Sequence, residues 1–368
     1  YLGANLMSRQ SELAELSRVY DSSALSNRNL LINGSGQIYQ RGSGTIVTSG
    51  SVFGVDRFKF STANMDNIAG TFTQDSDSPD GFSNSIKATI TTAESAIASD
   101  EYAYIAQLVE AQNLQHLAYG TSAAKQVTLS FWVKSSITGT FAAGLYKGDN
   151  TAQIHNLTYT INSASTWEYK TLTFAANTLS GGAINNDNGE GFYVNWHLAA
   201  GSDYKGGGST SGWSAYANNK WADGQGTDAV ITTTNATFQL TGCQLEVGDS
   251  ATPFEHRSFG EELGKCMRYY YKSNYGATFT TGDLYFGRDT RVLQISFPTN
   301  MRANPSVTTC NDVSVGSGGG SGHYVVHGVN NYTDGANLHS TPNQFTMYTP
   351  NRSTSQPTKT GFIADAEL

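Results

Sequence analysis

The chain has 368 residues, of which 14% are charged, 11% are aromatic and 39 are glycine, and its formal net charge is −8. This length allows two or three domains at about 100–200 residues each. The low charge and high glycine content favour β-structure over a strongly helical fold, and the aromatic content argues against disorder. No run of Lys and Arg offers the basic surface that nucleic acids require, so no nucleic-acid partner is expected.

The first predicted element is a helix within residues 1–28. A heptad spacing, interrupted at one position by Arg9, relates the apolar residues Leu2, Leu6, Leu13, Leu16 and Tyr20. A seam of about three heptads is too short to persist alone in water. We therefore expect an attachment or oligomerisation segment, packed either on the body of the protein or on copies of itself.

From about residue 30 the sequence predicts strands separated by turns. Alternate apolar residues define one face of VTLSFWVK (127–134) and of GFYVNWHL (191–198). In ATFQLTGCQLEV (236–247) the apolar positions change from even to odd numbers at Gly242, which predicts one continuous strand with a β-bulge. Strands without intervening helices predict an antiparallel β-sandwich of jelly-roll type.

Residues 251–272, ATPFEHRSFGEELGKCMRYYYK, concentrate charged and aromatic side chains. Ser258 followed by Glu261 is a capping box, which predicts that a helix starts at Phe259 and links two parts of the chain across 258–272. Glu261 and Glu262 complement the helix N-terminus. Neighbouring helical residues point about 100° apart, which does not suit a catalytic carboxylate pair. We expect a structural joint here and no active site.

Strand patterns resume in residues 273–368 and predict a second, smaller β-sandwich domain. The residues expected to face inward are Leu284, Phe286, Leu293, Ile295, Phe297, Tyr324 to Val326, Phe345, Met347, Phe362 and Ile363. The run GSGGGSG (316–322) divides this region. It predicts a loop that does not bind phosphate, because neither Lys-Ser/Thr nor a helix follows it.

Cysteine usage and hydropathy limit the class of protein further. Cys243, Cys266 and Cys310 are odd in number and lack CxxC spacing, which predicts packed thiols and neither a disulfide framework nor a zinc site. No apolar run approaches the ~20 residues of a membrane span, and no signal-peptide core opens the chain. We expect a soluble protein with no encoded leader, no membrane insertion, no metal and no cofactor.

Five runs of this sequence resemble the C-terminal parts of tail-fibre and related receptor-binding proteins of tailed bacteriophages. The runs are NLLINGSGQIYQRG (29–42), VDRFKF (55–60), QLVEAQNLQHLAYGTSAAKQVTLSFWVKSS (107–136), QLEVGDSATPFEHRSFGEELGKCMRYYYK (244–272) and GFIADAEL (361–368). The resemblance implies a jelly roll similar to carbohydrate-binding modules over 29–257, a linking helix over 258–272 and a β-domain over 273–368. It also implies a homotrimer on the virion. It transfers no ligand site, because the shared residues belong to the scaffold.

The first candidate site is the polar, glycine-rich segment 201–226. It carries the rings of Tyr204, Trp213, Tyr216 and Trp221, together with Asn218, Asn219 and Asp223. Sugar rings present apolar C–H faces that stack on aromatic side chains, and amide or carboxylate groups bind their hydroxyls. We predict glycan binding here. The alternative is that the rings cover the edge of the sandwich or a contact between subunits.

The second candidate site is HYVVHGVNNYTDGANLH (323–339), in which His323, Tyr332 and Asp334 are candidate glycan ligands. A metal site is not expected, because His323 and His327 share a strand face but lie ~13 Å apart along it. The segment QDSDSPDG (74–81) loosely resembles a calcium loop, but the match fails at position 5 of the loop, where a ligand is required. We expect a solvated turn there.

No GxSxG, HExxH or cysteine-nucleophile signature is present, nor the fixed-period repeats of β-helical tailspikes. Together with the resemblance to phage receptor-binding proteins, these absences lead us to expect a non-catalytic tail fibre that binds host surface polysaccharide or lipopolysaccharide and assembles with other virion tail proteins. The alternatives are a connector or decoration protein of the virion without receptor binding, and a glycan hydrolase or lyase.

Overall fold

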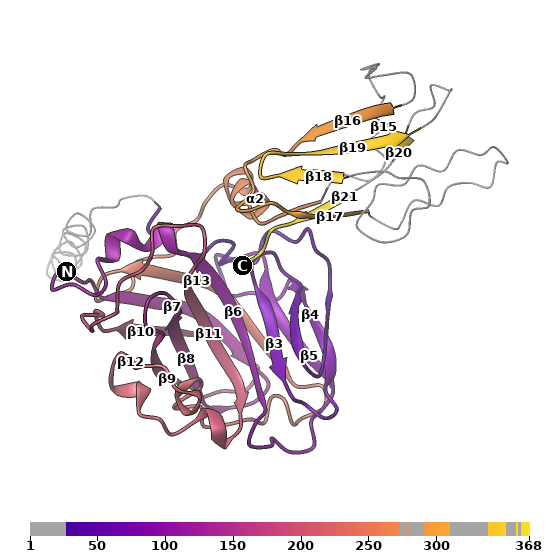
Figure 1. The fold of residues 1–368 in the computed structure, drawn as a ribbon. Coiled ribbons are helices and arrows are strands. Elements are labelled where there is room, and N and C mark those ends of the chain that lie inside the picture. The colour runs from indigo at the N-terminus through magenta and orange to yellow at the C-terminus, as the bar shows by residue number, and fades with distance from the viewer. Residues whose placement is uncertain (1–26, 273–277, 280–289, 310–337, 351–357, 360–361) are drawn as a thin grey trace, which may run out of the picture. The chain divides into compact units, whose positions relative to one another are not determined.

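The computed structural model describes residues 27–272, 278–279, 290–309, 338–350, 358–359 and 362–368 (Figure 1). The chain divides into two compact units, Tyr1–Phe259 and Gly260–Leu368. The described part is mainly β, with antiparallel sheets and few helices, as the composition predicts. None of the helices described is long and apolar enough to cross a membrane. The helix expected within 1–28 lies almost wholly outside the described residues.

Two antiparallel sheets build the described part of the first unit. Sheet A has six strands in the order β1-β4-β5-β13-β7-β10, and sheet B has seven in the order β12-β9-β8-β11-β6-β3-β2. The bounds in sheet A are β1 Gly44–Ile46, β4 Ala69–Asp75, β5 Ser85–Thr92, β13 Thr237–Val247, β7 Val127–Ser135 and β10 Glu168–Phe174. Those in sheet B are β12 Ser214–Ala215, β9 Gln153–Ile161, β8 Gly139–Lys147, β11 Glu190–Ala200, β6 Tyr102–Glu110, β3 Lys59–Ala63 and β2 Gly50–Phe53. The short 3-10 helices are η1 Ala111–Leu117, η2 Ser202–Tyr204, η3 Ser209–Ser211 and η4 Asn218–Lys220.

The core of the first unit lies between the two sheets. Phe131 of β7 meets Trp196 of β11 edge-on with ring centroids 5.8 Å apart, and Phe141 of β8 contacts Phe238 of β13 at 5.6 Å. All four side chains are fully buried, and burial of each contributes roughly 1.5–3 kcal/mol. The inward positions of both alternating segments are buried as predicted, and the unit is an antiparallel β-sandwich.

The predicted β-bulge in β13 is confirmed. The register of β13 against β7 shifts between Thr241 and Gln244, and Gly242 has a φ of 59°. The extra residue lets Leu240 and Cys243 both face the core despite their opposite parity. Cys243 and Cys266 are buried, as expected of packed side chains, whereas Cys310 lies outside the described residues.

The charged residues that precede the helix are part of the scaffold. Glu255 accepts a hydrogen bond from the Asn29 backbone N–H at 2.9 Å and pairs with Arg257 at 3.0 Å. Arg257 also donates to the Leu31 carbonyl at 3.1 Å. Burial alone would raise the pKa of Glu255, but the Asn29 N–H and the Arg257 charge lower it. The pair ties the residues near 29–31 to the end of the sandwich.

The described part of the second unit contains three short antiparallel sheets, in the strand orders β14-β21-β17, β15-β20 and β16-β19-β18. Helix α2 (Phe259–Met267) begins where the capping box predicts, but it ends before the expected residue 272. Tyr270–Lys272 instead form β14, because they pair antiparallel with β21 (Phe362–Asp365) and because Tyr favours strands. The remaining described strands are β15 Thr278–Phe279, β16 Thr290–Ser296, β17 Ser306–Thr309, β18 Leu338–Thr341, β19 Gln344–Pro350 and β20 Thr358–Lys359.

Candidate functional site

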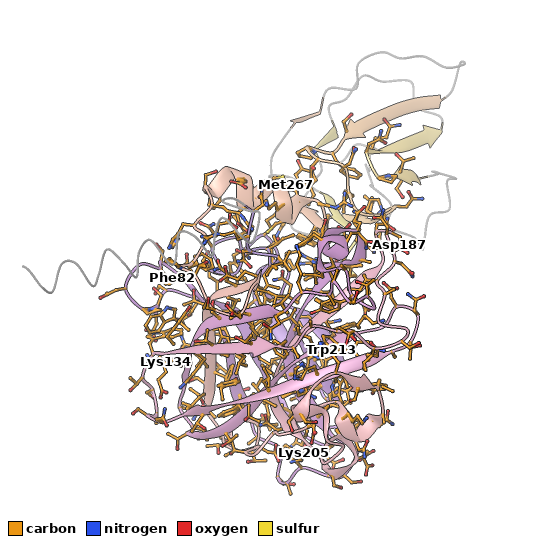
Figure 2. The ribbon with its side chains drawn as sticks, turned by 90° about the vertical axis from the view of Figure 1, so that its left-hand side faces the viewer. Phe82, Lys134, Asp187, Lys205, Trp213 and Met267 are labelled. Atoms are coloured by element: carbon orange, nitrogen blue, oxygen red, sulfur yellow. The ribbon has the colours of Figure 1, made fainter. Side chains whose placement is uncertain are left out.

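The segment 201–226 is anchored to the outer face of sheet B, the face turned away from the core. Its strand β12 pairs with β9, so that Ser214 lies opposite Ile154. From β9, the Asn156 side-chain amide donates to the Lys220 carbonyl at 2.6 Å and to the Ser209 hydroxyl at 2.8 Å. These bonds hold the segment against the sheet. Lys205 and Trp213 of this segment are labelled in Figure 2.

An aromatic cleft of about 490 Å³ lies between this segment and sheet B. The sheet contributes tyrosines from three neighbouring strands, β6, β11 and β8, which lie side by side in Figure 1. The nine lining residues are Tyr102, Tyr104, Tyr146, Glu190, Tyr193, Tyr204, Tyr216, Asn218 and Trp221. Every ring in the cleft therefore ends in a phenol hydroxyl or an indole N–H.

Trp221 is the centre of the ring cluster. Its ring contacts Tyr104 at 5.4 Å and Tyr146 at 5.5 Å, both edge-on, and it meets Tyr216 at 6.2 Å. Tyr102 packs against Tyr204 at 4.8 Å, which joins the sheet to the start of the segment. Edge-to-face contacts of this kind hold each ring in a fixed orientation, so the walls of the cleft are preorganised.

The electrostatics of the cleft centre on Glu190. Burial raises the pKa of Glu190 to about 7, while the Lys59 charge opposes this shift and the Asp149 charge adds to it. Lys59 lies over the Tyr193 ring, 4.5 Å from its centroid, and its ammonium is 3.3 Å from the Tyr193 hydroxyl. Burial likewise raises the pKa of Tyr104 to about 12. The pKa values of the other cleft tyrosines are raised as well, so these tyrosines keep their hydroxyl protons at physiological pH.

Four of the site residues predicted from the sequence, Tyr204, Tyr216, Asn218 and Trp221, line this cleft. Tyr216 donates to the Asn218 side-chain carbonyl at 3.2 Å, so the two present a joined polar edge. The rings expected to act together in the 201–226 segment are therefore only partly brought together.

The other predicted residues lie elsewhere. Trp213 packs in the sandwich core, stacked on Phe192, and donates to the Ala175 carbonyl at 2.7 Å. Asp223 is buried and accepts the backbone N–H groups of Gly206 and Ser209 at 2.8 and 2.6 Å, which is a structural role. Asn219 is exposed and does not line the cleft. The second candidate site, with His323, Tyr332 and Asp334, lies outside the described residues.

Sequence reasoning missed the sheet half of the cleft, namely Tyr102, Tyr104, Tyr146, Tyr193 and Glu190. The alternation contained a usable signal. Because Phe192 and Val194 face the core, Tyr193 between them must face outward, and a large ring on the outer face of a strand calls for a covering segment or a ligand.

One group of carboxylates in the described part of the chain is close enough to share a cation. The side-chain oxygens of Asp66, Glu94 and Glu101 lie within 4.8 Å of one another. Glu94 also accepts the backbone N–H groups of Asn67 and Ser95 at 2.9 and 2.8 Å, and Glu101 accepts that of Ala98 at 2.8 Å. These hydrogen bonds give Glu94 and Glu101 a structural role in the loops they join.

No protein-family model and no curated protein match this chain. Among solved structures, the enzymatically active domain of tailspike protein 4 of bacteriophage CBA120 is 15% identical with a TM-score of 0.35, over 60% of this chain and 22% of that one. A family 11 carbohydrate-binding module from Clostridium thermocellum, in complex with a mixed-linked tetrasaccharide, is 13% identical with a TM-score of 0.27, over 58% and 98%. The tripod from the baseplate of bacteriophage Tuc2009 is 12% identical with a TM-score of 0.25, over 93% and 91%. This chain thus spans about a fifth of the tailspike, and similarity this low assigns no function.

Proposed function

We propose that this chain is part of a phage virion appendage, a tail fibre, that binds bacterial surface glycans in the aromatic cleft without cleaving them. The observation that carries the glycan assignment is the ring-lined cleft of about 490 Å³ on the outer face of sheet B. The virion assignment rests on the five sequence runs that resemble tail fibres. In this proposal the sandwich is a jelly roll of the carbohydrate-binding-module type.

The lining of the cleft suits a sugar chain. A pyranose has two faces of C–H groups with hydroxyls around its rim, so it needs flat apolar surfaces and hydrogen-bonding groups in the same place. Six tyrosines and one tryptophan supply both, since each ring is apolar across its face and polar at one end. Asn218 adds an amide, which donates and accepts. A few polar groups within a mainly aromatic cleft are the usual form of a small-molecule site.

In this proposal the cleft binds a glycan without cleaving it. Glu190 is the one carboxyl group among its nine lining residues, all of which the structure describes, whereas glycosidases generally use two. Asp149, whose charge acts on Glu190, accepts the Asn185 backbone N–H at 3.0 Å and its side-chain amide at 2.9 Å. It is thereby held by the neighbouring loop. The raised pKa of Glu190 serves binding in this proposal: the protonated group donates to a sugar oxygen.

Binding at one cleft is expected to be weak, because the site is open and sugars are well hydrated. Trimeric assembly, as the resemblance implies, would present three clefts to one polysaccharide and raise the overall affinity by 10²–10⁴-fold, a rough range for linked sites. Firm adsorption of the virion would then depend on valency.

The test is binding of the whole purified chain to a panel of bacterial surface polysaccharides and lipopolysaccharides. Tyr216→Ala and Tyr204→Ala should weaken binding about tenfold or more, whereas the control Phe259→Ala, at an exposed residue outside the cleft, should leave it unchanged. New reducing ends after incubation would show that the chain is a hydrolase. Failure to bind any glycan, with the cleft covered by another protein in the virion, would favour the connector role.

A further inference from the structure

A second aromatic pocket lies on the outer face of sheet A, on the opposite side of the sandwich from the cleft. Trp132 on β7 alternates with core residues and so faces outward, and Tyr169 on β10 is its direct cross-strand partner. The pocket encloses about 440 Å³. Its lining residues are Asp80, Gly81, Phe82, Ser130, Trp132, Tyr169, Gly242, Pro253, Phe254 and His256. Figure 2 shows Phe82 well apart from Lys205 of the 201–226 segment.

The bulge in β13 makes room for this pocket. A Cβ at Gly242 would lie 2.7 Å from Cζ of Phe82 and 3.2 Å from Cδ1 of Trp132. With glycine there, both rings approach the strand backbone beside the pocket. Gly242 therefore has two effects. On the inner side of β13, the bulge lets Leu240 and Cys243 both face the core, and on the outer side the missing Cβ leaves room beside Phe82 and Trp132.

Two groups of rings form the walls. Trp132 and Tyr169 lie 5.4 Å apart and tilted by 50°, and Tyr169 keeps 46% of its surface exposed. Opposite them, Phe82 contacts Phe254 edge-on at 5.2 Å and His256 at 5.4 Å. The rings hold one another in place while the pocket stays open to solvent within the first unit.

The chemistry of this wall differs from that of the cleft. Phe82, Phe254 and Pro253 offer no side-chain hydrogen-bonding group, so a ligand hydroxyl turned toward them would lose its water without a replacement partner, which is unfavourable. Polar side chains are present at other points of the lining, where Asp80 and His256 are exposed. A fitting ligand must combine a ring face for Trp132 and Tyr169 with a small apolar group and a few polar ones.

We propose that this pocket is a second glycan-binding site, selective for a pyranose that carries a methyl group. The sugar ring lies on Trp132 and Tyr169, and its methyl group points at Phe82 and Phe254. Two kinds of bacterial sugar share this chemistry, the 6-deoxyhexoses and the N-acetylated hexosamines. The pocket is independent of the cleft on sheet B and does not rest on the function proposed for it.

The test is saturation-transfer NMR on the full chain with three probes. Methyl α-L-rhamnopyranoside carries a C6 methyl group, and methyl N-acetyl-β-D-glucosaminide carries an acetamido methyl group. Methyl α-D-glucopyranoside has neither and carries only the glycosidic O-methyl group that all three probes share. We expect at least one methyl-bearing probe to bind with its strongest signal at that methyl group, and the first two probes distinguish the two sources. The glucoside should bind at least about tenfold more weakly.

Variants assign the signal to this pocket. Tyr169→Ala removes an exposed ring and should weaken binding of the methyl-bearing probe about tenfold, which corresponds to roughly 1.4 kcal/mol. Phe82→Leu keeps the pocket apolar but removes a ring edge and should reduce the preference for the methyl group. The control Leu179→Ala replaces an exposed side chain that lines neither this pocket nor the cleft on sheet B, and it should leave this binding unchanged.

Three results would overturn the proposal. The first is equal binding of the glucoside and the methyl-bearing sugars, and the second is unchanged binding by Tyr169→Ala. The third is a change of oligomeric state in Tyr169→Ala, measured by sedimentation, because it would mean that a second copy of the chain covers the pocket. A cleft on sheet B that binds no sugar would leave all three measurements interpretable.

Discussion

Replacement of Gly242 by alanine tests the double role of the β-bulge. Gly242 has a φ of 59°, where a side chain costs roughly 1–2 kcal/mol. The new Cβ would also lie 2.7 Å from Cζ of Phe82, and overpacking of this kind costs roughly 1–3 kcal/mol. Because Phe82 is only half-buried and can partly move away, we expect Gly242→Ala to lower the free energy of unfolding by roughly 2–4 kcal/mol.

Gly42 provides a matched control for the backbone component. Its φ is 80° and a Cβ there would meet nothing within 4 Å, so Gly42→Ala should cost only the conformational part, roughly 1–2 kcal/mol. The assay is urea unfolding followed by tryptophan fluorescence. All five tryptophans lie in the first unit, so the signal reports on the sandwich alone, and the midpoint and slope give the free energy.

The larger effect at Gly242 should come with a change in the shape of the sheet A pocket, because the new Cβ displaces the Phe82 ring that lines it. The reasoning is refuted if the two glycine variants lose the same free energy. It is refuted equally if Gly242→Ala costs less than about 1 kcal/mol. Either result would mean that the space beside the bulge is not set by the missing Cβ.

Three further predictions concern the ionisable side chains of Glu190, Lys147 and the Glu255–Arg257 pair. Because the pKa of Glu190 is raised from 4.5 to about 7, its contribution to stability is present below about pH 4.5 and is lost as the pH rises through about 7. Glu190→Gln should therefore make the thermal unfolding midpoint depend less on pH across this range. An unchanged pH profile would contradict this prediction. Lys147 is fully buried and its ammonium donates to four backbone carbonyls, so Lys147→Met should cost roughly 3 kcal/mol or more in urea unfolding, and a neutral result would show that these carbonyls find other donors. Arg257→Ala leaves the partly buried Glu255 carboxylate without its cation and should cost roughly 1.5–3 kcal/mol in urea unfolding. A double variant that also carries Glu255→Ala should recover part of this loss, and strictly additive losses would rule out coupling.

The strand alternation and the bulge could be predicted because both depend on local geometry. Side chains in a strand alternate between two faces, so the buried set of β7, β11 and β13 follows from residue order alone. The start of α2 follows in the same way from Ser258 and Glu261. Its end does not, because Tyr270 joins a strand pairing with Asp365, nearly a hundred residues later.

The cleft depends on sheet order, which local patterns do not contain. Tyr104, Tyr146 and Tyr193 come from β6, β8 and β11, which are neighbours only because sheet B places β11 between the other two. Trp213 and Trp221 illustrate the same limit within one segment. Both are predicted from the sequence to bind a ligand. In the structure, Trp213 turns into the core and donates to the Ala175 carbonyl, whereas Trp221 faces the cleft.

The cleft on sheet B and the pocket on sheet A are both lined by aromatic rings, but their hydrogen-bonding groups differ. Each combines outward-facing rings of sheet strands with rings from the segments beside the sheet. On sheet B every ring has a polar end, which suits a hydroxyl-rich sugar; on sheet A the Phe82 side has none, which suits a methyl group. Two unlike sites on opposite faces would let one sandwich engage two segments of a branched polysaccharide at once. The second contact would then form at the high effective concentration of a linked site. Inhibition of polysaccharide binding by a sugar for the sheet B cleft together with a methyl-bearing sugar for the sheet A pocket should therefore exceed the inhibition by either sugar alone.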